Sequence, residues 1–526
     1  MDNILVSCFV ARIAYAFRRM YGMSIFSRIV NAIKEAYAKS NTKHILCSFL
    51  SIPSTLVYSR YYRILNGFNL SLLAFGNRFQ TIADESIAFR CCRAFRDSNF
   101  VARSAIFSWF RRTGVRGLLI IAFGMYLPID YTIREVLGIE SLGAIWDEAF
   151  MLFCVAYIIW RLIFTRREHV KPRATPVDGP LMVFISVALV LMVVVSPAAS
   201  VAFAGFRAVC QFMLWFFVLT RLIENDRDLK TFYFTICTMA VAVGLHGIYQ
   251  YIIGAEMPAK WVASAESGMR TRVYSITGSP NIMGALMVMT APMLAALAYY
   301  LKPIWLKCLM WACTGILCLA VLFTFSRGAW FGLVVAVVIF CLCVDPKLLV
   351  VVAIGVMGLL FFVPEISNRI MFLFTSDFAN ANAKGGRGQR WATGFVLLGT
   401  NPLFGFGLGR FGGAIAMQNQ VIENLDYFYM DNYYMKTLVE MGYVGIIAYA
   451  FLLLSNIFAS IRGMFKTRRD KLSLLSVGMF SGMLGVLTHS FFENIFEVPY
   501  MNAYFWGLAA AIMYISYLRR KKNVTA

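Results

Sequence analysis

The chain has 526 residues, of which 60% are hydrophobic and only 14% are charged. Soluble domains are about half apolar and about a quarter charged, so this composition excludes a soluble globular protein. The formal net charge of +22 would suit a nucleic-acid-binding protein. The cations lie mostly between and before apolar segments, however, where they orient membrane helices and contact anionic lipid headgroups. We therefore expect membrane lipids, and no nucleic acid, among the partners.

Residues 1–110 differ in pattern from the rest of the chain. Apolar residues recur there four positions apart, as at Leu5, Phe9 and Ile13, with arginines and lysines between them. This pattern is typical of basic amphipathic helices that lie on a membrane surface. A small helical cytoplasmic domain is the alternative. The first apolar patches are short and interrupted by arginines, so we expect no cleavable signal peptide.

Residues 111–526 are predicted to form a polytopic transmembrane domain. Apolar runs long enough to cross about 30 Å of hydrocarbon recur to the end of the chain. A helix satisfies its own backbone in lipid, so the predicted fold class is all-α, with about twelve transmembrane helices. The predicted spans begin near Gly117, Gly143, Pro180, Val201, Thr231, Asn281, Trp305, Gly328, Leu348, Thr437, Leu474 and Met501. Pro128 and Asp130 interrupt the first of them.

The distribution of cations predicts which ends of these spans face the cytoplasm. Cations occur in residues 165–173, 221–230, 301–307, 344–347, 460–471 and 519–522, which alternate along the chain with short and mainly neutral segments. By the positive-inside rule, the cationic loops and both termini are cytoplasmic. Residues 254–280 and a long loop over residues 364–435 then lie outside the cytoplasm.

Several polar motifs fall in the segments assigned to the outer face. They are TRVYSITGSPNIMG (271–284), FSRGAWFG (325–332), KGGRGQRW (384–391), NPLFGFGLGRFGG (401–413) and MDNYYMKTLVEMGYVG (430–445). Arg207 is expected in the outer half of a span, where a charge is costly unless it meets a partner. The twelve cysteines show no paired metal-binding spacing such as C-x2-C, so we expect no metal site.

The arginines of these motifs suit a phosphate ligand. A guanidinium group binds phosphate oxygens through paired hydrogen bonds and stays charged at any working pH. Arg272, Arg327, Arg387 and Arg390 would therefore suit a pyrophosphate near the membrane surface. The alternatives are a membrane anchor at a helix end for Arg327, and a solvated loop for Arg387 and Arg390.

Aromatic residues near these arginines would suit a sugar. Trp391 and Tyr433 each combine a flat apolar face with a polar edge, and both are candidates for binding a sugar ring. The aromatic cluster over residues 427–434 also fits an interfacial belt, which is the alternative.

Taken in order, the motifs resemble the O-antigen ligase and O-antigen polymerase superfamily of bacterial glycan assembly. The order is R-x-x-x-x-TGSPN, then SRG after a span, R-x-x-R-W, NPLFGFGLG and DNYYMKTLVEMGYVG. The resemblance covers roughly residues 230–500. It implies a glycosyltransferase with about twelve spans in the bacterial cytoplasmic (inner) membrane, and an active site on the periplasmic or extracellular side.

The resemblance also implies the reaction and its partners. Members take a glycan from an undecaprenyl-diphosphate carrier and transfer it to an acceptor hydroxyl, on a lipid A core sugar for ligases or on a growing chain for polymerases. No metal or nucleotide cofactor is thought necessary. The expected partners are the lipid-linked donor, a glycan or glycolipid acceptor, and further proteins of glycan assembly.

By the same resemblance, Arg272 and Arg327 look like diphosphate ligands, with Arg387 and Arg390 as further candidates. The ligase motif usually has a histidine where this chain has Asp431. An aspartate can take the acceptor proton as a base, or it can cap the following helix. The departure favours a polymerase or divergent transferase over a standard lipid A core ligase.

The remaining candidates are residues expected to bind substrate around this centre. They are Arg207, Asn281, Trp391, Asn432, Tyr433, Glu440 and His489. Glu493 is an alternative carboxylate, expected with His489 near the outer end of a span. Attack on the side opposite the leaving diphosphate would invert the anomeric centre.

Two other classes of function fit a polytopic membrane protein. A transporter or flippase for polysaccharide or lipid-linked sugar would use a similar number of spans, although no internal repeat is evident. A non-catalytic subunit of a glycan-export complex would need the arginines only for contacts with its partners.

Overall fold

The computed structural model describes residues 105–164, 173–258, 271–375, 386–420 and 429–519, except residues 197, 363, 373 and 374, and a few isolated positions between residues 63 and 86. The chain divides into two compact units, residues 1–63 and 64–526, and the description below concerns the second. The amphipathic pattern predicted within residues 1–110 lies almost wholly outside the described residues.

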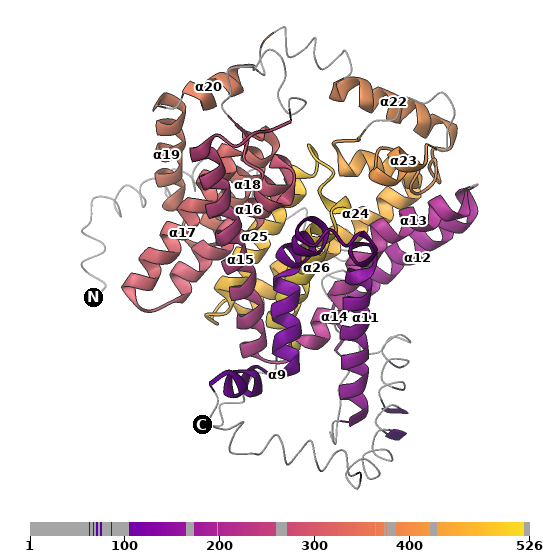
Figure 1. Cartoon of the computed structure of the whole chain (residues 1–526), viewed down its shortest axis with the longest axis horizontal. Coiled ribbons are helices and arrows are strands. Elements are labelled where there is room, and N and C mark those ends of the chain that lie inside the picture. The colour runs from indigo at the N-terminus through magenta and orange to yellow at the C-terminus, as the bar shows by residue number, and fades with distance from the viewer. Residues whose placement is uncertain are drawn as a thin grey trace, which may run out of the picture. The chain divides into compact units, whose positions relative to one another are not determined.

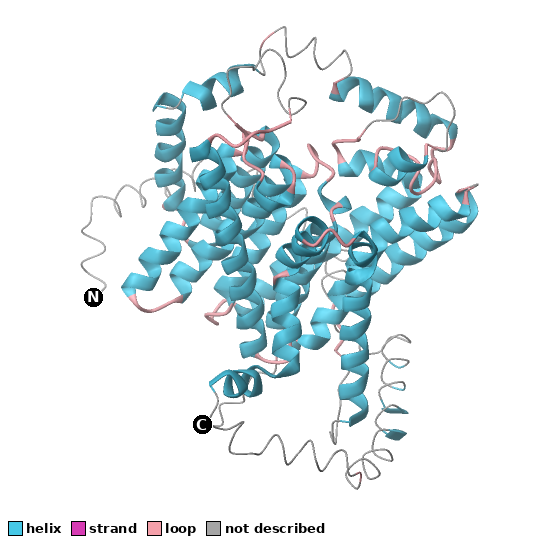
Figure 2. Ribbon diagram, viewed as in Figure 1, coloured by secondary structure: helices cyan, strands magenta, loops and turns pink. Residues whose placement is uncertain are grey.

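The described part of the second unit is built from helices, with no strand among the residues described (Figures 1 and 2). The helices are α9 (Ala105–Gly124), α10 (Tyr126–Tyr131), α11 (Glu140–Phe164), α12 (Asp178–Val195), α13 (Ala199–Cys210), α14 (Trp215–Leu222), α15 (Asp226–Ile253), α16 (Pro280–Tyr300), α17 (Ile304–Phe323), α18 (Arg327–Val344), α19 (Leu348–Phe362), α20 (Pro364–Met371), α22 (Arg387–Thr400), α23 (Ala414–Asn419), α24 (Tyr433–Thr467), α25 (Ser473–His489) and α26 (Pro499–Met513). Short 3-10 or π turns are η1 (Thr132–Val136), η2 (Gln211–Leu214), η5 (Ser275–Thr277), η7 (Ile495–Glu497) and η8 (Tyr514–Leu518). The predicted all-α class is confirmed for this part of the chain.

Eight of the described helices are long and apolar enough to cross a membrane, or nine if one bent pair counts as a span. Two shorter apolar helices, Leu348–Gly358 and Ser473–His489, accompany them. The chain is therefore a multi-pass membrane protein. The count of about twelve spans stays a prediction, although each predicted start falls on a helix. The stretch predicted as one long loop, 364–435, contains α20, α22 and α23.

The bent pair explains why the first predicted span looked interrupted. Helices Thr113–Gly124 and Tyr126–Val136 meet at an angle of 70°. Pro128 has no N–H to donate to the carbonyl of Gly124, four residues earlier. The hydroxyl of Tyr504 on α26 donates to that carbonyl at 3.0 Å and accepts from the N–H of Leu127 at 3.1 Å. The bend is thus held by a side chain of the last helix.

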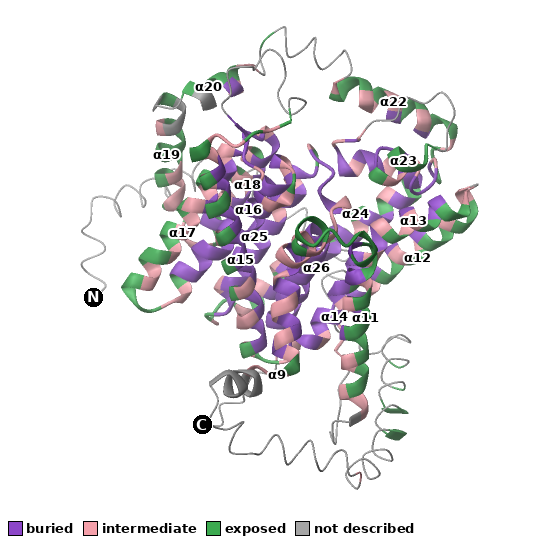
Figure 3. Ribbon diagram, in the orientation of Figure 1, coloured by how far each residue is buried: buried purple, intermediate pink, exposed green. Residues whose placement is uncertain are grey.

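The core of the unit surrounds α16, whose residues are almost all buried (Figure 3). Helices α15, α17, α18 and α25 pack against it. Helix α25 approaches it closely, because a Cβ added at Gly482 would lie 2.0 Å from the carbonyl oxygen of Met289. Only a residue without a side chain fits there, so the two backbones meet directly, as small residues permit between membrane helices.

Helix α24 is broken at Gly442, and the segment 402–407 fills the break. Gly442 has φ 63° and ψ −167°, outside the helical region. The carbonyls of Val439 and Glu440, which the break frees, accept from the N–H groups of Phe406 and Gly407 at 2.8 and 3.0 Å. A Cβ at Gly405 would lie 2.4 Å from the nitrogen of Gly442. The glycines of NPLFGFGLG therefore let the backbone of the segment 402–407 lie directly against the backbone of α24 at its break.

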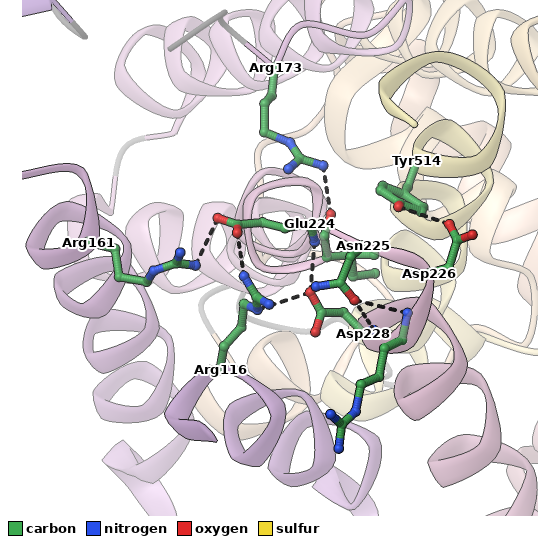
Figure 4. Close-up of polar contacts among 10 residues, drawn as sticks. Arg116, Arg161, Arg173, Glu224, Asn225, Asp226, Asp228 and Tyr514 are labelled. Carbon is green, nitrogen blue, oxygen red and sulfur yellow. Dashed lines mark hydrogen bonds and ion pairs between the residues drawn. The ribbon is translucent and has the colours of Figure 1, made fainter. Parts of the chain in front are cut away.

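One end of the bundle is joined by ion pairs, and we call it the ion-pair end (Figure 4). Arg116 of α9 and Arg161 of α11 both pair with Glu224, which precedes α15. The Nε of Arg116 also lies 3.0 Å from the carboxylate of Asp228. Arg173 also donates to the carbonyl of Ile223 at 2.6 Å, so two loops that the cation pattern assigned to the cytoplasmic face, 165–173 and 221–230, lie together. On which side of the membrane they lie stays a prediction.

A second set of ion pairs extends this end to the C-terminal part of the chain. Arg519 binds the two carboxylate oxygens of Asp226 at 2.7 Å each and also pairs with Asp470. These pairs raise the pKa of Arg519, with the hydrogen bond to Asp226 as the largest cause. Because α15, α24 and α26 run from here to the arginine motifs, those motifs lie at the opposite end, which we call the site end.

Candidate functional site

Helices α16, α18, α22 and α24 all begin at the site end, and each brings a predicted site residue with its first turn. Asn281 is the second residue of α16, and Arg327 and Arg387 are the first residues of α18 and α22. Asn432 caps α24, because its Oδ1 accepts from the N–H of Met435 at 3.0 Å. Helix N-termini carry partial positive charge and free N–H groups, so several of them together favour an anion.

The guanidinium group of Arg272 is buried and held in one orientation. Its Nε donates to the carbonyl of Thr324 at 3.0 Å, and its Nη2 donates to Oδ1 of Asn281 at 3.2 Å. The N–H of Val273 donates to the carbonyl of Phe323 at 3.1 Å. The TRVYSITGSPN motif therefore lies along the turn between α17 and α18, directly before Arg327.

Asn281 connects Arg272 to a buried carboxylate. Its Nδ2 donates to Oε2 of Glu493, in the segment between α25 and α26. The other oxygen of Glu493 accepts from the backbone N–H of Asn494 at 3.2 Å. Burial raises the pKa of Glu493, and its hydrogen bond from Asn281 acts in the opposite direction.

Asp431 lies between two arginines of α22. Its Oδ2 accepts from Nε of Arg387, and its Oδ1 lies 3.7 Å from Nη1 of Arg390. Arg387 also donates from Nη2 to the carbonyl of Phe492 at 2.9 Å, and Arg390 donates to the carbonyl of Tyr429 at 3.2 Å. Both arginines therefore lie on a helix, not in a loop, and face a carboxylate, while 44% of the Arg387 side chain and 34% of the Arg390 side chain are exposed. The cap of α24 is Asn432, so the capping alternative for Asp431 is wrong.

Arg327 starts the helix that packs on the turn after α25. Its guanidinium lies 5.8 Å from the ring centre of Phe372. The next residue, Gly328, leaves no room for a side chain, because a Cβ there would lie 2.8 Å from both the imidazole of His489 and Cβ of Phe492. His489 is itself buried. The N-terminus of α18 thus lies against His489 at the end of α25 and Phe492 in the turn after it, and Arg387 of α22 contacts the same Phe492.

Four predicted residues have structural contacts rather than positions among these arginines. Arg207 on α13 pairs with Glu148 on α11 at 2.7 Å. Glu440 accepts from the N–H of Phe411 at 3.2 Å and from Nζ of Lys436 at 2.9 Å, which fixes the segment 401–413 against α24.

The other two are aromatic. Tyr433 is buried among other rings, with Phe496 at 5.3 Å between ring centres. Trp391 packs on a small apolar cluster that includes Met435 and Val439. A substrate-binding role for these four residues stays a prediction.

Sequence reasoning gave little weight to the segment after α25. It placed His489 and Glu493 near the site but identified neither the carbonyl of Phe492 nor the link from Glu493 to Asn281. The available signal was a carboxylate and an asparagine, Glu493 and Asn494, directly after a predicted span. Among the described residues, no group of three or more histidine, cysteine, aspartate or glutamate side chains could hold a metal ion.

Comparison with known proteins supports the resemblance seen in the motifs. Residues 312–450 match the family model described as O-antigen ligase, which confirms the resemblance to the ligase and polymerase superfamily. The match contains Arg327, Arg387, Arg390 and Asp431 and ends before His489 and Glu493. It is narrower than the range of roughly 230–500 over which the motifs were compared. A search of curated proteins found no match to the chain.

Proposed function

We propose that this O-antigen ligase-like membrane protein transfers a glycan from an undecaprenyl-diphosphate carrier to a sugar hydroxyl of an acceptor. The family match supports the general role, the joining of lipid-linked glycans. The observation that carries the specific proposal is the gathering of Arg272, Arg327, Arg387 and Arg390 at the converging helix N-termini. We place this end outside the cytoplasm, on the basis of the cation pattern.

The charge of this cluster fits a diphosphate. The cluster holds four arginines and two carboxylates, Asp431, which pairs with Arg387 and Arg390, and Glu493, on which Arg387 acts, so the arginines exceed the carboxylates by two. Guanidinium groups bind phosphate oxygens in fixed geometry, and helix N-termini add N–H donors directed at the same region. A diphosphate with two or more negative charges would balance this excess.

The arginines would act mainly on the transition state. As the bond between the sugar and the diphosphate breaks, negative charge grows on the leaving oxygen. Positive groups already held in place stabilise that charge without reorganisation. Arg272 is prepared for this role, because the carbonyl of Thr324 and the amide of Asn281 fix its guanidinium.

Asp431 would take the proton of the acceptor hydroxyl. In the structure its carboxylate pairs with Arg387 and Arg390, and we propose that the diphosphate replaces it as their partner. The released carboxylate accepts the proton, and the acceptor oxygen bonds to the anomeric carbon from the side opposite the diphosphate. The bond from that carbon to the diphosphate oxygen breaks, its electron pair leaves with undecaprenyl diphosphate, and the anomeric configuration is inverted.

The test is transfer by purified protein. Wild type would be incubated with an undecaprenyl-diphosphate oligosaccharide, with and without a separate glycolipid acceptor, and the products resolved by size. A ladder without added acceptor identifies a polymerase, which the aspartate at position 431 favours. A single shift that requires the acceptor identifies a ligase. If the carrier binds and no product forms in any mixture, the proposed transfer is wrong.

One observation favours transport as a second candidate function. Transporters often place their substrate where a membrane helix is broken, and α24 is broken at Gly442. In this chain the segment 402–407 occupies that break and satisfies its backbone groups. Movement of a fluorescent lipid-linked sugar across liposomes without transfer to any acceptor would favour transport over the proposed reaction.

A further inference from the structure

The turn that follows α25, residues 490–494, contacts Arg387 directly and is linked to Arg272 through Asn281. The carbonyl of Phe492 accepts from Nη2 of Arg387 at 2.9 Å. The side chain of the next residue, Glu493, accepts from Nδ2 of Asn281, whose Oδ1 in turn accepts from Nη2 of Arg272. Neighbouring residues of one short turn thus reach Arg387 on α22 and Arg272 before α16.

The amide of Asn281 can serve Arg272 in only one orientation. A guanidinium group has donors and no acceptor, so it must meet the oxygen of the amide and not its NH2 group. A carboxylate has acceptors and no donor, so Glu493 must meet the NH2 group. Glu493 therefore fixes the amide so that its oxygen faces Arg272. A glutamine at position 493 can donate as well as accept, and it would leave the amide free to turn.

Both ends of this chain of hydrogen bonds are buried, with 7% of Glu493 and 8% of Arg272 exposed. A buried ionised carboxylate is costly unless other groups bind it. Besides Asn281 and the N–H of Asn494, the charged groups that act on Glu493 are Arg387 and Asp431. The carboxylate thus lies within the electrostatic reach of the proposed diphosphate site while its hydrogen bond is directed at Asn281.

We propose that Glu493 is a positioning residue for glycan transfer, which acts through Asn281 to aim the guanidinium of Arg272 at the diphosphate that Arg387 also binds. Its carboxylate does not touch the reacting atoms in this account. The turn 490–494 would then set the distance between Arg272 and Arg387, the two arginines that bind the leaving diphosphate. This inference rests on the proposed function, because it assumes a diphosphate at the arginine cluster.

The same segment of the chain provides a matched control, Glu497. It is also a glutamate between α25 and α26, and its two oxygens accept from the N–H of Ala414 at 2.9 Å and from the amide of Asn494. The change Glu497→Gln removes the same charge from the same segment without removing the partner of Asn281. An effect specific to Arg272 should therefore follow Glu493→Gln and not Glu497→Gln.

The experiment is a double-mutant cycle on the full-length protein in lipid nanodiscs, with undecaprenyl diphosphate as the probe and its dissociation constant as the readout. Glu493→Gln should weaken binding about tenfold, the scale of one lost hydrogen bond to a charged group. In an Arg272→Lys background the same change should weaken binding by less than about twofold, since residues that act as a unit are not additive. Glu497→Gln should have the same effect in both backgrounds.

The inference is overturned if Glu493→Gln weakens binding equally in both backgrounds, or if it has no effect on wild type. If Glu493→Gln does not fold, Asn281→Ala replaces it, and the same loss of effect in the Arg272→Lys background is expected. Glu493→Asp, which keeps the carboxylate, should recover part of the affinity. A wild type that binds the probe without transferring glycan contradicts the proposed function alone, because the cycle depends only on binding.

Discussion

The two ends of the bundle use the same pair of chemical groups, arginine and carboxylate, in different ways. At the ion-pair end, Arg116, Arg161 and Arg519 pair with carboxylates that hold helix ends together. At the site end, arginines outnumber carboxylates, and Arg272 is fixed by uncharged groups, the carbonyl of Thr324 and the amide of Asn281. We infer from this difference that the arginines of the ion-pair end stabilise the fold, whereas those of the site end can bind an anion.

Asp431→Asn should produce the largest effect on transfer. The amide cannot accept the proton of the acceptor hydroxyl, so the rate should fall at least about 100-fold, the lower range for loss of a general base. Binding of undecaprenyl diphosphate should tighten by roughly fivefold, because the partner that competes for Arg387 and Arg390 is removed. Weaker binding would show that Asp431 does not exchange with the diphosphate, and an unchanged rate would show that Asp431 is not the base.

Arg272→Lys should lower the transfer rate by about 100-fold, comparable with the loss of one directed donor to a developing oxyanion. Lysine keeps the charge but cannot contact Thr324 and Asn281 with a planar fork. The matched change at the other end is Arg161→Lys, which should leave transfer per folded molecule unchanged. Equal transfer rates for the two variants would contradict the assignment of transfer to the site end alone.

The pH dependence of transfer should include an acid limb that belongs to Glu493. Burial raises the pKa of Glu493, so the carboxylate that orients Asn281 is fully ionised only at pH values above that raised pKa. As the pH falls through this pKa the carboxylate becomes protonated, and the rate of transfer should fall. Comparing wild type with Glu493→Gln isolates this limb, since Asp431 and Arg387, the charged groups that act on Glu493, are present in both. Identical profiles would exclude Glu493 as its source.

Glu224→Gln should have the smallest effect on function and a clear effect on stability. It removes the shared partner of Arg116 and Arg161, and these partly exposed pairs should contribute roughly 1–2 kcal/mol to the free energy of unfolding. The unfolding temperature in detergent should fall while transfer per folded molecule stays the same. A loss of transfer without a loss of stability would place function at the ion-pair end as well.

Sequence alone indicated which motifs lie at one end of the bundle, because the alternation of cationic and neutral loops separates the two ends. It placed Arg272, Arg327, Arg387 and Asp431 on one face, and the structure brings their segments together. It could not give the pairings among them. Asn281 and Glu493 are 212 positions apart, and no local pattern indicates which distant side chain an amide meets.

The sequence also left open which residue caps α24, because Asp431 and Asn432 are neighbours and both side chains can serve. Their orientation depends on α22, because Asp431 pairs with Arg387 of that helix while Asn432 caps α24. The break at Gly442 was likewise hidden, because a glycine in a membrane helix also fits close packing. Its role follows only from the approach of the segment 402–407.

The most direct test of this account compares the two ends in one assay, the affinity for undecaprenyl diphosphate in nanodiscs. The double variant Arg387→Gln/Arg390→Gln removes two arginines from the site end, and Arg116→Gln/Arg161→Gln removes two from the ion-pair end. The account predicts that the first loses at least about 100-fold in affinity, with two charge-assisted contacts removed, while the second binds as wild type does. Equal affinities in the two variants would contradict a diphosphate site at the converging helix N-termini.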